Sequence, residues 1–189
     1  MTRRAPTALF VLGGLGAAGL LLIAAGGSTV TQPLVTAVQG AAGRFFSWAE
    51  LTASTTAQRL GLANTPPPAA AANLQRLVTD LLDPLRARLG RPIRVTSGFR
   101  SDAVNEAVHG SPTSQHRSGE AVDFKVPGAA SRDVAAFIAR SGLPFDQVIW
   151  YDPERGGHVH LSYTTTRPNR REVLYAPASG GYRPWPVSA

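Results

Sequence analysis

Apolar residues recur at intervals of three and four along residues 74–88, which is the spacing of one face of an amphipathic helix. These positions are Leu74, Leu77, Val78, Leu81, Leu82 and Leu85. Asn73 precedes the run and can cap the helix, and Gly90 follows it and can end the helix. Pro84 lies inside the run. Because proline removes a backbone donor and its ring clashes with the preceding turn, we expect a kink or a split there.

Shorter apolar runs predict the other elements of a folded domain. Two further helices are expected over residues 101–108 and 131–140, the second capped by Ser131 and stopped by Gly142. The predicted strands span residues 93–97, 121–126, 147–151, 158–163 and 172–175. The strands do not alternate regularly with helices, so we predict a single α+β domain with an antiparallel sheet and flanking helices.

The N-terminal part of the chain has a different pattern. Residues 8–27 are apolar or glycine throughout, and two arginines, Arg3 and Arg4, precede them. Twenty such residues can cross a bilayer as a helix, and a basic start before an apolar stretch is also typical of a secretory signal peptide. We therefore expect residues 1–27 to be a transmembrane or signal anchor, with a cleaved signal peptide as the alternative, and residues 28–44 to be a linker. The positive-inside rule places the following domain outside the cytoplasm.

Charge and composition narrow the classes of partner. The chain has 19 basic and 12 acidic residues, a net charge of +7, and Lys125 is its only lysine. A basic chain can bind nucleic acid, a membrane surface or an acidic polymer. The arginines are scattered and are not interleaved with aromatic residues, so nucleic acid is not the expected partner. The absence of cysteine excludes disulfide scaffolds, thiolate zinc sites and cysteine nucleophiles.

Candidate metal ligands come from two separate elements. His116 and Asp123 belong to the run Ser-Gln-His-Arg-Ser-Gly-Glu-Ala-Val-Asp, residues 114–123, which leads into a predicted strand. His158 and His160 share one face of another strand, because alternate residues of a strand point to the same side. Neutral imidazole and carboxylate are good zinc ligands, and catalytic zinc sites use three protein ligands plus water. Two histidines and an aspartate would supply such a set.

This pattern, Ser-x-His-x-x-Gly-x-Ala-x-Asp followed by a strand with His-x-His, resembles the zinc peptidoglycan peptidases of the D-alanyl-D-alanine carboxypeptidase and bacteriophage L-alanyl-D-glutamate endolysin group. Residues 95–101, Val-Thr-Ser-Gly-Phe-Arg-Ser, resemble the Ser-Gly-Tyr-Arg-Ser element that precedes this motif in the family. Residues 45–57 resemble the opening of one branch. The resemblance implies a zinc peptidase domain over residues 45–176, with residues 177–189 as a tail and the proline-rich residues 65–72 as a loop inside the domain.

The resemblance also implies roles for individual residues. The implied zinc ligands are His116, Asp123 and His160. Arg100 matches an arginine that contacts a substrate carboxylate or polarised carbonyl, a role that suits the fixed charge and the donor fork of a guanidinium. Ser114 matches a serine that can hydrogen-bond within the substrate site, and His158 matches a histidine that steadies the developing oxyanion.

One position departs from the family pattern. Many members carry a catalytic Asp or Glu three residues before the last zinc histidine, where this chain has Gly157. Hydrolysis needs a general base that takes a proton from the attacking water. We expect Asp152 to be that base, because it lies just beyond the strand at 147–151 on the loop that leads to the histidine-bearing strand. Glu154 and Asp146 are the alternatives.

The resemblance therefore implies a zinc-dependent peptidase that hydrolyses amide bonds in peptidoglycan stem peptides, as a D,D-carboxypeptidase or an endopeptidase, with a zinc-activated water. Its expected place is outside the cytoplasm, on a membrane through the N-terminal helix or secreted if that segment is cleaved. The alternative is a catalytically inactive, zinc-bearing protein that binds the cell wall or is a structural protein of a phage particle. Its main support is Gly157, which stands where many family members have a catalytic carboxylate.

Overall fold

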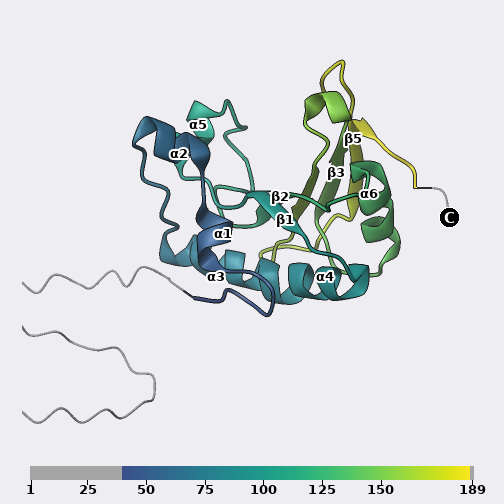
Figure 1. Ribbon diagram of the computed structural model, residues 1–189, viewed down its shortest axis with the longest axis horizontal. Helices are drawn as coiled ribbons and strands as arrows, with labels where there is room; N and C mark the ends of the chain where they lie inside the picture. The colour runs from purple at the N-terminus through teal and green to yellow at the C-terminus, as the bar shows by residue number, and fades with distance from the viewer. Residues whose placement is uncertain (1–39, 188–189) are drawn as a thin grey trace, which may run out of the picture. The chain divides into compact units, whose positions relative to one another are not determined.

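The computed structural model describes residues 40–187 (Figure 1). The apolar segment expected to be a transmembrane or signal helix, residues 1–27, and most of the expected linker lie outside the described residues. Within residues 40–187, no helix is both long enough and apolar enough to cross a membrane.

A six-stranded sheet forms the centre of the domain, with the strand order β1-β2-β4-β3-β5-β6 (Figure 1). The strands are β1 (Arg94–Ser97), β2 (Ala121–Lys125), β3 (Gln147–Tyr151), β4 (Val159–Ser162), β5 (Glu172–Ala176) and β6 (Arg183–Pro184). The first five agree with the predicted strands to within about a residue. The described residues thus form the predicted α+β class of fold.

One strand pair differs from the antiparallel sheet that the sequence predicted, because β3 and β5 are parallel. Ser162, at the end of β4, pairs with Gln147, at the start of β3. The chain therefore leaves β4 at the edge where β3 begins. A loop then carries it past β3, and Glu172 enters the sheet beside Gln147 in the same direction. The short crossover, rather than a hairpin, makes this pair parallel.

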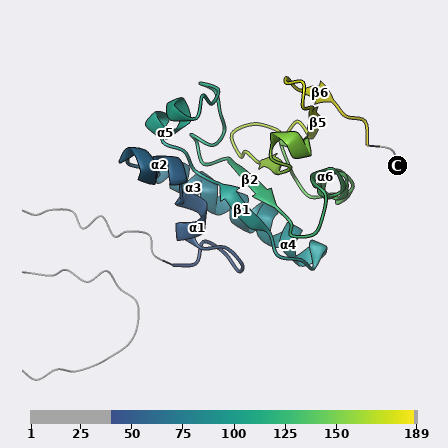
Figure 2. The ribbon, with the colours of Figure 1, turned by 45° about the horizontal axis from the view of Figure 1, so that its top comes forward.

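The helices lie mostly against one face of the sheet or beside its β1 edge (Figures 1 and 2). They are α1 (Trp48–Thr52), α2 (Thr55–Leu60), α3 (Pro68–Arg76), η1 (Leu77–Leu82), α4 (Asp83–Leu89), α5 (Asp102–Ala107), α6 (Ser131–Arg140) and the 3-10 turn η2 (Pro153–Arg155). Helix α6 packs against β3 and β4. Its predicted cap is not used, because the Ser131 hydroxyl instead donates to the carbonyl of Tyr151.

The predicted helix at 74–88 is present but longer than expected. It runs through α3, η1 and α4, starts at Pro68 and ends at Gly90, whose positive φ closes the last turn. Proline is well suited to a first helical position, whereas the Asn73 side chain donates to the carbonyl of Ser118 instead of capping. The helix is not split at Pro84. The wider π-helical turn η1 precedes it, which gives the proline ring room within a continuous helix.

The apolar stripe of this helix forms the core with one face of the sheet. Its six predicted apolar positions are fully buried. The buried residues Phe46, Trp48 and Leu51 belong to the same core, so packing begins upstream of α3. Part of the expected tail also belongs to the fold: β6 pairs with β5, and Trp185 packs against Trp150 at 5.4 Å between ring centroids.

Candidate metal centre

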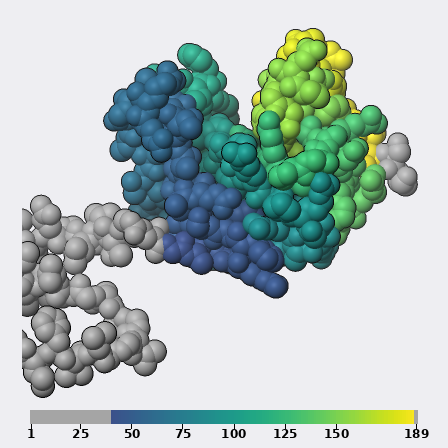
Figure 3. Space-filling view, in the orientation of Figure 1, coloured from purple at the N-terminus to yellow at the C-terminus, as the bar shows by residue number. Residues whose placement is uncertain are grey.

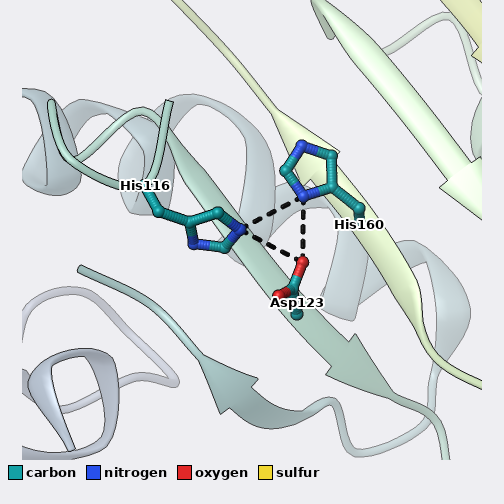
Figure 4. A group of neighbouring side chains, drawn as sticks. All are labelled: His116, Asp123 and His160. Atoms are coloured by element: carbon teal, nitrogen blue, oxygen red, sulfur yellow. Dashed lines mark hydrogen bonds and ion pairs between the residues drawn. The ribbon is translucent and has the colours of Figure 1, made fainter. Parts of the chain in front are cut away.

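Three side chains from different elements meet at one point (Figure 4). Nε2 of His116 lies 3.2 Å from Oδ1 of Asp123 and 3.2 Å from Nδ1 of His160. Nδ1 of His160 lies 2.9 Å from the same carboxylate oxygen. One ligand atom from each residue is therefore available within 4.8 Å of the others, an arrangement that can hold a metal ion.

The sheet places two of these residues directly beside each other. Asp123 on β2 and His160 on β4 are register partners, so their side chains leave the same face of neighbouring strands. His116 comes from the turn before β2. Its backbone carbonyl accepts hydrogen bonds from the amides of Arg100 and Gly119, which fixes this turn against the segment after β1.

A backbone contact determines which nitrogen of His116 faces the cluster. Nδ1 of His116 lies 2.7 Å from the carbonyl oxygen of Gly98, and a carbonyl can only accept, so Nδ1 carries the proton. Burial lowers the pKa of the His116 imidazole, which favours the neutral ring. A neutral imidazole with a protonated Nδ1 presents the lone pair of Nε2 to the cluster, as a metal ligand must.

Asp123 uses its two carboxylate oxygens differently. Oδ1 faces both histidines, and Oδ2 accepts a hydrogen bond from the Arg100 guanidinium. Burial alone would raise the pKa of Asp123, but the neighbouring His116 and His160 hold it well below its usual range. The donors are therefore two imidazole nitrogens and one carboxylate oxygen, and this set suits zinc. Arg100 orients the Asp123 carboxylate through Oδ2, the oxygen that faces away from the histidines.

Two glycines of the quoted motifs are required by close backbone approaches. A Cβ on Gly98 would lie 2.1 Å from the carbonyl oxygen of Leu51, and a Cβ on Gly119 would lie 2.1 Å from that of Ala70. Gly119 also has a positive φ of 74°. These glycines let α1 and α3 pack directly against the segments that hold His116. The glycines of the motif therefore help to fix the position of this ligand.

The cluster lies in a cavity of about 740 Å³, which opens between two parts of the molecular surface in Figure 3. Arg100, Ser114 and His158, the other predicted site residues, line this cavity together with the three candidate ligands. His158 stacks on Tyr151, with ring centroids 4.0 Å apart. Burial lowers the pKa of the His158 imidazole.

The structure does not bring Asp152 into this cavity. Its Oδ1 accepts from the amide of Glu154, and its Oδ2 accepts from the hydroxyl of Tyr175. Tyr175 stacks on Trp150, which packs against the core. Because side chains alternate along a strand, Trp150 points away from the face that carries Tyr151. The Asp152 carboxylate therefore caps η2 and is held on the side of the sheet opposite the metal centre.

The two alternative carboxylates are also outside the cavity lining. Glu154 is exposed on η2. Asp146 is fully buried and accepts hydrogen bonds from Arg167 and Arg170. Burial alone would raise its pKa, but these two arginines hold it well below the usual range. Asp146 therefore anchors the loop between β4 and β5.

The turn itself explains the glycine three residues before His160. Gly156 and Gly157 both have positive φ values, 96° and 55°, which glycine adopts at no steric cost. Among the described residues that line the cavity, Asp123 is the only one with a carboxylate.

Sequence reasoning missed several residues that line the cavity, chiefly His109, Tyr151 and Tyr182. Tyr151 lies on the face of the sheet that carries His160, because it alternates with Ile149, the register partner of His160, and this pairing is known only from the structure. Tyr182 carried no signal in the sequence, since its position depends on β6 pairing with β5.

Comparisons with known proteins agree with this site. Residues 44–162 match the family described as Peptidase M15, which covers more than half of the chain and includes all three candidate ligands. A search of curated proteins finds no match. The chain therefore belongs to the Peptidase M15 family, the zinc D-alanyl-D-alanine carboxypeptidase type of metallopeptidase that its motifs resemble.

Proposed function

We propose that this protein is a zinc-dependent peptidase that hydrolyses amide bonds in peptidoglycan stem peptides. The observation that carries the proposal is the His116–Asp123–His160 cluster, which lies in an open cavity of a chain that belongs to the Peptidase M15 family. A zinc ion held by these three residues would act as a Lewis acid and would activate water near neutral pH.

Arg100 is suited to hold the substrate beside the cluster. Its Nε donates to the hydroxyl of Ser97 and its Nη2 donates to Asp123, which fixes the guanidinium plane. Within the described residues Nη1 makes no hydrogen bond, so it can donate to an oxygen of the substrate. A fixed guanidinium can bind either a terminal carboxylate or the carbonyl of the cleaved bond.

His158 is suited to stabilise the charge that develops on the cleaved carbonyl. It precedes His160 by two residues and lines the same cavity, and its stacking on Tyr151 holds the ring in place. A donor that is positioned before the reaction stabilises an oxyanion without reorganisation. Ser114, on the loop before His116, lines the cavity, and its hydroxyl would hydrogen-bond the substrate.

The proposed substrate agrees with the proposed location. Peptidoglycan lies outside the cytoplasmic membrane, and an anchor formed by residues 1–27 would hold the domain on that side. Cleavage of this segment would give a secreted enzyme instead.

Hydrolysis by the full-length protein tests the proposal. We would incubate the purified chain with peptidoglycan sacculi, alone, with a chelator, and with zinc added back, and identify the released fragments by mass spectrometry. Fragments that appear only with the metal would support the peptidase and would name the bond that is cut. If zinc is bound but no fragment is released, the inactive wall-binding or virion protein would be favoured instead. The lack of a second carboxylate in the described cavity lining is consistent with that alternative.

The role of Asp152 can be decided in the same assay. We expect Asp152→Asn to leave kcat within about threefold of the wild-type value, because the carboxylate is engaged by Glu154 and Tyr175 away from the cavity. His158→Ala should lower kcat about 100-fold, the effect typical of a lost oxyanion donor. A loss of kcat for Asp152→Asn as large as that for His158→Ala would restore Asp152 as the general base.

A further inference from the structure

The cavity that holds the metal centre lies between two walls (Figure 3), and different side chains line each of them. One wall is formed by α2 and by α5 with the loop that follows it. The other is formed by the end of β3 and by the turn between β5 and β6, which lies beyond the residues that match the family. On this second wall, Tyr182 therefore lies beyond the matched range, whereas Tyr151 and His158 lie inside it.

The first wall is rich in hydroxyl groups and also carries His109. Its polar side chains include Ser54, Thr55, Thr56, Ser111, Thr113 and Gln115. Among the described residues of α2, α5 and the following loop that line the cavity, none is a carboxylate, a lysine or an arginine. Hydroxyl groups both donate and accept hydrogen bonds, so this wall suits a ligand that carries many hydroxyl and amide groups of its own.

The second wall presents an exposed aromatic ring. Tyr182 is 55% exposed, the most exposed of the large apolar or aromatic side chains in the described residues. It is nevertheless held in place. Its hydroxyl lies 3.0 Å from that of Tyr151, and the Arg155 guanidinium packs over both rings. Arg155 also donates to the carbonyl of Gly181, next to the ring it covers.

We propose that this cleft contains a saccharide-binding subsite, with Tyr182 as the platform on which a sugar ring packs and the hydroxyl-rich wall as its hydrogen-bonding partner. The negative face of an aromatic ring attracts the weakly positive C–H groups of a pyranose. An ordered, exposed tyrosine opposite a wall rich in hydroxyl groups suits an uncharged ring with hydroxyl and acetamido groups.

The arginines around this wall are already engaged within the protein, and Arg155 beside Tyr182 donates to the carbonyls of Pro177 and Gly181. Arg167 and Arg170 line the cavity, but both are paired with Asp146. Arg100 is next to the metal centre and pairs with Asp123. The subsite rests on the proposed function and deepens it: the enzyme would prefer stem peptides that are still attached to their sugars.

Paired substrates test this subsite. We would measure kcat/KM of the full-length, zinc-loaded protein on a disaccharide-linked stem peptide and on the same peptide without sugar. Tyr182→Ala is expected to lower kcat/KM on the sugar-linked peptide about tenfold, mainly through KM, and to change it less than twofold on the free peptide. Leu60→Ala, at another exposed side chain that does not line the cavity, is the matched control and should change neither value. An equal effect of Tyr182→Ala on both substrates, or none, would overturn the subsite.

A binding measurement separates the subsite from the peptidase function and does not depend on folding of the variant. We would titrate the wild-type protein with the peptide-free disaccharide of N-acetylglucosamine and N-acetylmuramic acid and follow binding by NMR. Millimolar binding that competes with the sugar-linked peptide is expected. If the protein binds the disaccharide but hydrolyses no substrate, the proposed function is contradicted and the subsite is supported. If the protein hydrolyses its substrate but shows no disaccharide binding at a disaccharide concentration of about 10 mM, the subsite alone is contradicted. That limit corresponds to a binding free energy weaker than about 3 kcal/mol.

Discussion

His116→Ala is expected to abolish stoichiometric zinc binding and to lower the hydrolysis of peptidoglycan about 1,000-fold or more. His116 supplies the most buried donor of the cluster, and its Nε2 contacts both of the other candidate ligands. Two remaining donors cannot complete the three-ligand set of a catalytic zinc site. The Lewis acid would then be lost, and with it several kcal/mol of transition-state stabilisation, at about 1.4 kcal/mol for each tenfold in rate.

Metal content measured by mass spectrometry, together with the rate of fragment release, checks this expectation. His109→Ala is the matched control, because His109 lines the same cavity but does not belong to the cluster. It should retain one equivalent of zinc. If His116→Ala also retains one equivalent, the cluster is not the metal site.

Gly98→Ala is expected to damage both the stability and the metal site, although residue 98 contributes no side chain. The new Cβ would lie 2.1 Å from the carbonyl oxygen of Leu51 and 2.9 Å from its carbonyl carbon, and both are backbone atoms that cannot rotate away. The segment after β1 would have to move away from α1. That movement would break the hydrogen bond from the amide of Phe99 to Leu51 and would displace the carbonyl that orients His116.

We expect Gly98→Ala to lower the free energy of unfolding by about 3 kcal/mol, at the upper end of the cost of overpacking a core. Zinc affinity should fall about 10- to 100-fold, as it does when the hydrogen-bond partner of a metal-bound histidine is disturbed. Urea unfolding and a zinc titration against a competing chelator would measure these changes. Gly40→Ala is the control, since no atom lies within 4 Å of the Cβ it would add. Equal unfolding midpoints for Gly98→Ala and Gly40→Ala would contradict the expected clash between a Cβ at residue 98 and the backbone of Leu51.

Much of the fold could be predicted from periodicity. The apolar spacing of residues 74–88 identified the core helix, since burial on one face requires that spacing, and five strands agree with their predicted ranges closely. The exceptions have local causes. Pro84 does not split the helix because the π-helical turn η1 absorbs it, and Asn73 does not cap because its side chain bonds to Ser118.

Topology could not be predicted in the same way. The parallel pairing of β3 with β5 depends on where the loop after β4 returns to the sheet, and β6 depends on pairing with β5. Such pairings join residues far apart in the chain, and no local pattern of apolar and polar positions encodes them.

The same division holds for the functional site. The sequence by itself offered histidines and an aspartate as donors, and the resemblance of its short motifs to the family implied that His116, Asp123 and His160 are the ligands among them. Only the tertiary structure decided how the remaining groups are placed around them. Asp152 is directed to Tyr175 and away from the cavity, whereas Tyr182 is brought to the cavity wall, because each depends on how β5 pairs with its neighbours.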